Sequence, residues 1–187
     1  VQLSLRNFLK KLISKIMFDQ IDIMRDFFVK GGPVFTGVFL LSICLWALII
    51  ERYYFIYKIY PLRLKAIVQQ WKKRHERSSW FALRIRDGLL SDISIELKHN
   101  LIPIRALTGI LPLLGLLGTV TGMIAIFEVL NAFGNGNARG MAEGISRALL
   151  PTTAGLVTSI IGIYFSADLY KRTKTNELLA KDLLTHD

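Results

Sequence analysis

Hydrophobic positions along the chain gather in three long stretches without a charged residue, separated by segments that mix basic, aromatic and aliphatic residues. The stretches run from Gly31 to Ile50, from Ala106 to Phe127 and from Ala148 to Ala167. Each has about 20 residues, and a helix of that length crosses a hydrocarbon core of roughly 30 Å. Because lipid offers the backbone no hydrogen-bond partner, such a stretch has to be helical. The pattern predicts an all-α polytopic membrane protein with three transmembrane helices.

The segments between the stretches are expected to be largely helical. Residues 3–28 carry apolar positions at helical spacing with basic interruptions, which is typical of an amphipathic helix. This helix either lies in the headgroup plane or packs on a partner protein, and Gly31-Gly32-Pro33 ends it. We expect an N-terminal interfacial helix (1–30), a first span with an aromatic and basic cytoplasmic end (31–60), a cytoplasmic helical segment (61–105), a second span (106–130), a periplasmic loop (131–144), a third span (145–170) and a cytoplasmic helical tail (171–187).

The net charge of +10 is concentrated in two segments. Of the 24 Lys and Arg residues, 16 lie in Glu51–Arg105 and in the tail after Tyr170. Three spans put these two segments on the same side of the membrane, and the positive-inside rule makes that side cytoplasmic. The N-terminus then faces the periplasm, although six basic residues before Gly31 favour the opposite orientation. We expect long helices that extend into the cytoplasm, and a lipid bilayer, not nucleic acid, around the chain.

Small and hydroxyl residues recur every three or four positions on the second and third stretches. The stripe on the second contains Thr108, Gly115, Gly118 and Gly122, with Thr119 at its edge; the stripe on the third contains Thr152, Gly155, Ser159 and Gly162. Membrane helices approach closely through such residues. Two interpretations remain open: the stripes are packing surfaces, or the hydroxyls of Thr108, Thr119, Thr152 and Ser159 line a shared polar cavity.

Prolines interrupt both of these stretches. Pro112 has no N–H to offer the carbonyl of Thr108, and Pro151 has none to offer that of Arg147. A carbonyl freed in this way is tolerated inside a membrane where other protein or cavity water satisfies it. We therefore predict kinked helices at Pro112 and Pro151.

Asp, Glu, Lys, Arg and His are absent from the interior of all three stretches. Because proton relays in membranes normally use such groups, a partner chain has to supply the titrating group if the assembly moves ions. Glu128 and Arg147, at the outer ends of the second and third spans, are expected to form a structural pair and not a relay. The histidines are isolated and no nucleophile–base set is present, so we expect no catalytic residue, no metal, no cofactor and no enzyme activity.

Two sequence motifs resemble a known family. The run LLGLLGTVTGM from Leu113 to Met123, followed by GISRALLPTTAGLV from Gly144 to Val157, is similar to the paired signature of the MotA/TolQ/ExbB proton-channel family. The resemblance covers about residues 103–170 and is greatest to ExbB, particularly to shorter ExbB-like members of secondary TonB systems. MotA is less similar, because its members have four spans.

The resemblance implies a homopentameric stator in the bacterial inner membrane. It would enclose the helices of an ExbD-like single-span protein whose membrane aspartate carries the protons, and the resulting motion would energise a TonB-like protein. Thr119 and Thr152 match the pore-facing threonines of the family, whereas Arg147 stands where a glutamate is common and Pro151 replaces a small residue. A TolQ-like or other motor-type stator and a non-conducting membrane scaffold are the alternatives.

Overall fold

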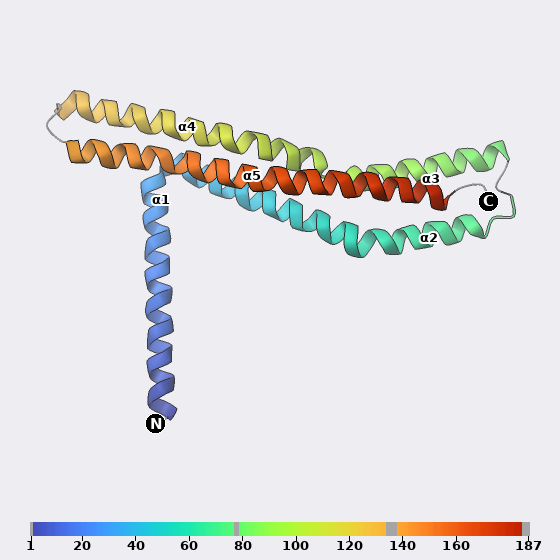
Figure 1. Cartoon of the computed structure of the whole chain (residues 1–187), viewed down its shortest axis with the longest axis horizontal. Coiled ribbons are helices and arrows are strands. Elements are labelled where there is room, and N and C mark those ends of the chain that lie inside the picture. The colour runs from blue at the N-terminus through green and yellow to red at the C-terminus, as the bar shows by residue number, and fades with distance from the viewer. Residues whose placement is uncertain (1, 77–78, 134–137, 185–187) are drawn as a thin grey trace. The chain divides into compact units, whose positions relative to one another are not determined.

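A computed structural model describes residues 2–76, 79–133 and 138–184 and contains no strand in these ranges. Its elements are the helix α1 (Gln2–Tyr54), a π-helical turn η1 (Phe55–Ile59), and the helices α2 (Tyr60–Lys72), α3 (Trp80–Lys98), α4 (Leu101–Phe133) and α5 (Ala138–Leu183). Figure 1 follows them along the chain from blue to red. The prediction of an all-α protein is confirmed.

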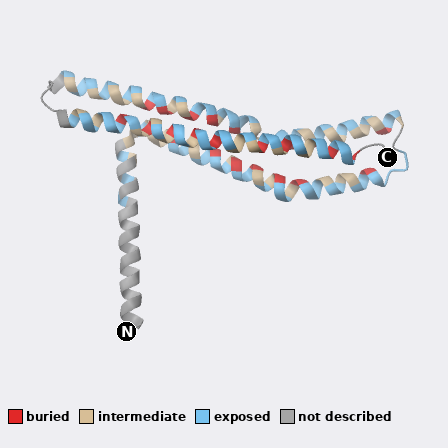
Figure 2. Ribbon diagram, viewed as in Figure 1, coloured by how far each residue is buried: buried red, intermediate tan, exposed pale blue. Residues whose placement is uncertain are grey.

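Three helical stretches within the described residues are long and apolar enough to cross a membrane. They are Gly31–Lys72, Trp80–Asn131 and Gly140–Leu183, and only 17, 17 and 28 % of their most apolar windows is buried in the subunit. Figure 2 accordingly shows buried positions scattered singly among exposed ones along α4 and α5. This exposed apolar surface is available to lipid or to other membrane helices, as expected for a polytopic membrane protein.

The connection between the second and third spans is shorter than predicted, because the helices on both sides of it extend into the expected loop. The loop was expected at 131–144, but α4 continues to Phe133 and α5 already begins at Ala138. Residues 134–137, with the glycines that suggested a turn, lie outside the described residues. Good helix formers such as Met141, Ala142 and Glu143 extend α5 across the rest of the predicted loop.

The chain divides into two compact units, and the first comprises Val1–Leu40 and Leu113–Gly155. In this unit α1 is interrupted at Gly32, whose φ of 70° lies in the left-handed region that favours glycine. The break falls within the predicted Gly31-Gly32-Pro33 motif. On either side of it, the ring of Phe28 packs edge-on against Phe35 and Phe39, at centroid distances of 5.6 and 5.0 Å. These aromatic contacts connect the two parts of α1 on either side of the break.

The second unit comprises Leu41–Pro112 and Leu156–Asp187, and its core joins α2 and α3 to the end of α5. The buried members of this core are Tyr60, Trp71, Ala82, Ile93, Leu97, Ala180 and Leu184. The Tyr60 hydroxyl donates to the carbonyl of Asn176 at 2.8 Å, and Nε of Arg86 donates to that of Leu184 at 2.6 Å. The helices beyond the spans therefore form a packed bundle with a core of its own.

The junction between α3 and α4 is fastened to α1. Asn100 adopts a φ of 61° between the two helices, and its side chain donates to Glu51 at 2.9 Å. The guanidinium of Arg52, only 1 % exposed, donates to the carbonyls of Glu96 and Leu97 and lies 4.6 Å from the ring centroid of Phe55. Because the last carbonyls of a helix have no partner within it, Arg52 satisfies the end of α3.

Candidate functional site

Glycines of α4 bring its backbone against α5 within the first unit. A Cβ atom placed on Gly115 would lie 2.9 Å from Cα of Thr152. A Cβ on Gly118 would lie 2.5 Å from Cβ of Pro151, and one on Gly122 would lie 2.5 Å from Cβ of Ala148. No methyl group fits at such distances, so the three glycines of the second stripe are packed directly on α5.

The hydroxyl of Thr152 links the two helices at the same place. Its Oγ1 donates to the carbonyl of Gly115 at 2.7 Å. Thr119 behaves differently, because its hydroxyl donates to the carbonyl of Leu116 on its own helix at 2.7 Å. Each hydroxyl therefore donates its proton to a carbonyl of the same chain, while its oxygen retains lone pairs that can accept a further hydrogen bond.

A second hydrogen bond between α4 and α5 lies in the second unit. Oγ of Ser159 donates to the carbonyl of Thr108 at 2.7 Å, and the two residues are 2 % and 3 % exposed. This carbonyl is the one that Pro112 leaves without a backbone donor. The hydroxyl of Thr108 donates to the carbonyl of Arg105 at 2.7 Å, and a Cβ on Gly162 would lie 2.6 Å from Cγ2 of Thr108. Thr108 and Ser159 are thus packed in the subunit, with their polar groups satisfied.

The two prolines of the spans and Gly155 all lie within continuous helices. Pro112 lies inside the continuous helix α4 and Pro151 inside α5, so neither proline ends its helix. Pro151 and Gly155 are buried, the former against Gly118. A bend of the helix axis at the two prolines stays a prediction.

The charges at the outer ends of the spans do not pair as predicted. Arg147 forms an ion pair with Glu143, one turn earlier on α5, at 2.7 Å, and both side chains are about half exposed. Glu128 is exposed on α4. Glu143 falls within the loop predicted at 131–144, whereas in the structure it lies on α5, four residues before Arg147. An exposed pair of this kind contributes only about 0.3–0.5 kcal/mol.

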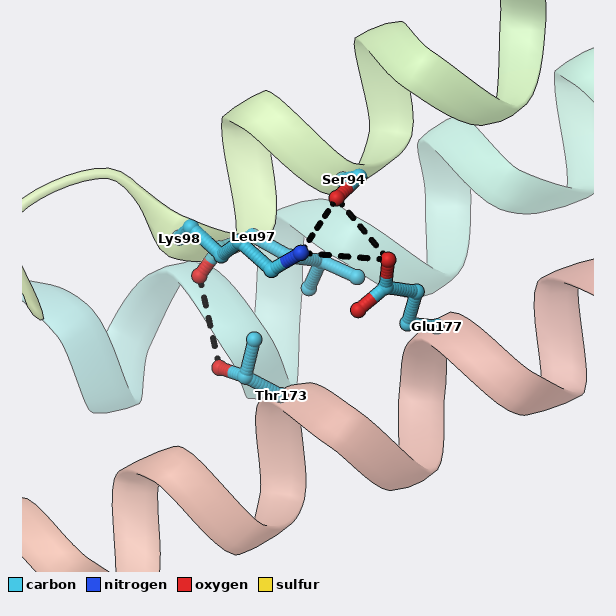
Figure 3. A network of polar contacts seen from close by, with 5 residues as sticks. All are labelled: Ser94, Leu97, Lys98, Thr173 and Glu177. Carbon is cyan, nitrogen blue, oxygen red and sulfur yellow. Dashed lines mark hydrogen bonds and ion pairs between the residues drawn. The ribbon is translucent and has the colours of Figure 1, made fainter. Parts of the chain in front are cut away.

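A polar network between α3 and α5 was not predicted at all (Figure 3). The carboxylate of Glu177 accepts hydrogen bonds from Ser94 at 2.9 Å and from Lys98 at 3.2 Å, and Lys98 also donates to Ser94 at 2.8 Å. Beside it, the hydroxyl of Thr173 donates to the carbonyl of Leu97 at 3.3 Å. Burial raises the pKa of Glu177, but the hydrogen bonds and the charge of Lys98 outweigh it, so the pKa lies below its usual value.

A second unpredicted network joins α1 to α5 near the basic end of the first span. The hydroxyl of Tyr53 and Nε of Arg172 both donate to the same carboxylate oxygen of Asp168, each at 2.6 Å. Arg172 also donates to the hydroxyl of Tyr57 at 2.7 Å. The sequence signal was the aromatic and basic cytoplasmic end predicted for the first span (31–60), a composition typical of an anchor in the headgroups. The structure adds a specific acidic partner for that end of the span.

The remaining chemistry of the described residues is sparse. They contain no group of three His, Cys, Asp or Glu side chains that could hold a metal ion. Cys44 is exposed on α1. An open groove of about 830 Å³ lies between the first turns of α4 and the part of α5 around Ser166, with Arg105 and Tyr170 among its lining residues.

Long apolar helices joined through glycines and hydroxyl-to-carbonyl hydrogen bonds, with a helical bundle beyond the spans, define a polytopic helical membrane protein. Residues 62–181, which include all of α4 and most of α5, match the MotA/TolQ/ExbB proton channel family. The chain belongs to the MotA/TolQ/ExbB proton channel family, and with its three spans it is an inner-membrane protein.

Two relatives from Synechocystis sp. carry ExbB-like names. ExbB-like 1 is 29 % identical over an alignment 189 positions long, which covers 83 % of this chain and 74 % of that protein. ExbB-like 3 is 31 % identical over 88 residues, which cover 46 % of this chain and 41 % of that protein. Both are named as biopolymer transport proteins. The resemblance to ExbB that the two sequence motifs predicted is confirmed.

Proposed function

We propose that the chain is the proton-channel and stator subunit of an inner-membrane complex similar to ExbB–ExbD. The complex uses the proton motive force to energise a TonB-like protein for transport across the outer membrane. The subunit has its N-terminus in the periplasm and its C-terminus in the cytoplasm, as the distribution of basic residues favours. Family membership and the ExbB-like relatives support this proposal.

The observation that carries the proposal is the combination of hydroxyls and missing acids in the spans. The three uncharged stretches hold threonines and serines but no Asp, Glu, Lys, Arg or His. Proton relays in membranes normally use ionisable side chains, so the subunit depends on another chain for the proton carrier. An ExbD-like single-span protein with a membrane aspartate supplies that carrier.

The subunit acts as a ring around this partner. The apolar surface that α4 and α5 expose is covered in the complex by copies of the same chain, which we propose to be five, by the partner's helix and by lipid. The oxygens of Thr119 and Thr152 each keep a free lone pair, with which they accept a hydrogen bond from the protonated carboxyl group of the partner. Thr108 and Ser159 are buried within the chain, so they line the proton path only if assembly of the ring exposes their oxygen atoms to it.

Proton flux into vesicles tests the proposal. The wild-type chain reconstituted with its single-span partner is expected to conduct, and the variant with both Thr119→Val and Thr152→Val is expected to assemble but to conduct at least tenfold less. Thr175→Val is the control, because that exposed threonine donates only to its own helix, at 3.1 Å. Undiminished flux in the double variant, or full flux from the chain without a partner, contradicts the proposal.

A non-conducting scaffold is the second candidate. It is favoured by the hydroxyl protons of Thr108, Thr119, Thr152 and Ser159, all of which are used within the subunit. A scaffold predicts no flux with any partner, together with normal assembly. A TolQ-like or other motor-type stator conducts as well, and differs in the client protein that the purified complex retains.

A further inference from the structure

The carbonyl of Thr108 presents a hydrogen-bonding problem that the sequence creates. In a regular helix it would accept the N–H of residue 112, four positions later. Proline at that position has no N–H, and α4 nevertheless continues as a helix on both sides of it. The carbonyl belongs to a residue that is only 3 % exposed, so bulk water does not reach it easily.

The hydroxyl of Ser159 occupies the place of the missing donor. It approaches the Thr108 carbonyl from α5 to 2.7 Å, in a site where Ser159 itself is 2 % exposed. A buried carbonyl without a partner is costly, and more so in a membrane than in water. One side chain of α5 therefore satisfies a defect in α4, and in doing so it ties the two helices together.

We propose that Ser159 is a positioning residue, whose hydroxyl replaces the backbone donor absent at Pro112 and holds α5 against α4. Its consequence for conduction rests on the proposed function, because α4 and α5 carry the threonines assigned to the proton path. The alternative is that Ser159 is present only for its small size, since Gly162 also packs closely on Thr108. The two explanations differ in their dependence on residue 112.

The test is a double-mutant cycle on the full-length chain in lipid–detergent micelles. Ser159→Ala removes the hydroxyl and leaves the carbonyl unsatisfied. Pro112→Ala restores an N–H to the helix, so the carbonyl no longer needs the hydroxyl. We expect S159A to lower the ratio of folded to unfolded chain about threefold, the average for a hydrogen bond between membrane helices, and to have little effect in the P112A background.

Two control variants accompany the cycle. Ser166→Ala removes a hydroxyl from the same helix, where the side chain lines the open groove, and is expected to leave the ratio unchanged. Pro151→Ala restores a backbone donor at the other span proline and is expected not to rescue S159A. An equal loss from S159A in both backgrounds, or no loss with Pro112 present, overturns the proposal. If S159A does not fold at all, recovery of folding in the P112A/S159A chain supports the proposal, and failure of that chain to fold overturns it.

Proton flux with the single-span partner gives the second measurement. S159A is expected to conduct less than the wild type, and P112A/S159A is expected to regain the loss, which reduced packing would not explain. Wild-type flux in S159A refutes the positioning role. If the unfolding cycle behaves as expected but the wild-type complex does not conduct, the proposed function fails while the hydrogen-bond replacement stands.

Discussion

Replacing Gly115 with alanine measures how much the close contact between α4 and α5 contributes to the stability of the subunit. The new Cβ would lie 2.9 Å from Cα of Thr152 and 3.0 Å from the carbonyl oxygen of Pro151, both backbone atoms, whereas ordinary contact begins at 3.4 Å. The helices would have to separate locally by about half an ångström. Neither atom belongs to a side chain that could rotate away.

The cost has two parts. Overpacking by a methyl group typically costs about 1–3 kcal/mol. Separation also stretches the hydrogen bond from Thr152 to the Gly115 carbonyl, now 2.7 Å long, and such bonds contribute about 0.6 kcal/mol. Alanine is a better helix former than glycine by up to about 1 kcal/mol, which would offset part of this.

Gly109→Ala is the matched control, because it makes the same change in the same helix where nothing lies within 4 Å of the new Cβ. The gain in helix propensity cancels between the two variants. We expect G115A to be less stable than G109A by about 1.5–3.5 kcal/mol, more than a tenfold change in the folded-to-unfolded ratio. Equilibrium unfolding of the purified subunit in micelles measures this difference. Equal stability of the two variants would refute the packing that the structure assigns to Gly115.

The same unfolding measurement checks three further predictions. Arg52→Ala removes the donors at the end of α3 and should cost at least about 1.5–3 kcal/mol, whereas the exposed Lys65→Ala should change stability by no more than about 0.5 kcal/mol; similar values would contradict the capping role. Because the pKa of Glu177 is lower in the folded chain than its usual value of 4.5, the ionised carboxylate stabilises the fold at pH values above 4.5. This contribution should be lost as the pH falls through the folded-state pKa. The free energy of unfolding of a Glu177→Gln chain should not show this decrease at low pH. If its pH profile is the same as that of the wild type, Glu177 is not the group responsible. Gly32→Ala should cost about 1–3 kcal/mol, because its φ of 70° and ψ of −170° lie in a region that essentially only glycine adopts, while Gly37→Ala, with equally open space, should not. Equal effects would rule out backbone strain at residue 32.

Hydrophobic patterning was sufficient to predict the three spans, because length and the absence of charge decide whether a helix can cross lipid. The glycine spacing of the second span left two interpretations open, a packing surface and a polar cavity, and the structure packs Gly115, Gly118 and Gly122 against α5. The proline rule identified the Thr108 carbonyl as unsatisfied, but not Ser159 as its donor. That pairing depends on the register between two helices, which residues on one helix do not determine.

Arg52 and Glu143 illustrate two other limits of sequence reasoning. A basic residue among aromatics at a span end is usually an interfacial anchor, and nothing local predicts that the end of α3 covers Arg52. Glu143 was assigned to a loop because nearby glycines and asparagines are typical of turns. The helix formers Met141 and Ala142, together with Glu143 itself, outweighed that signal, and the charge pairing of Arg147 changed with it.

The π-helical turn at Phe55–Ile59 determines which face of α2 meets the bundle. Such a turn holds one residue more than an α-helical turn, so all later side chains lie about 100° behind the positions that an uninterrupted α-helix of the same length would give them. Converting the turn to a regular α-helix at unchanged length would carry the indole of Trp71 about a quarter of a circumference away from its pocket while leaving the membrane-embedded part of α1 untouched. Removing one residue at the same time would restore its direction, so a one-residue deletion in this turn should be better tolerated than one later in α2.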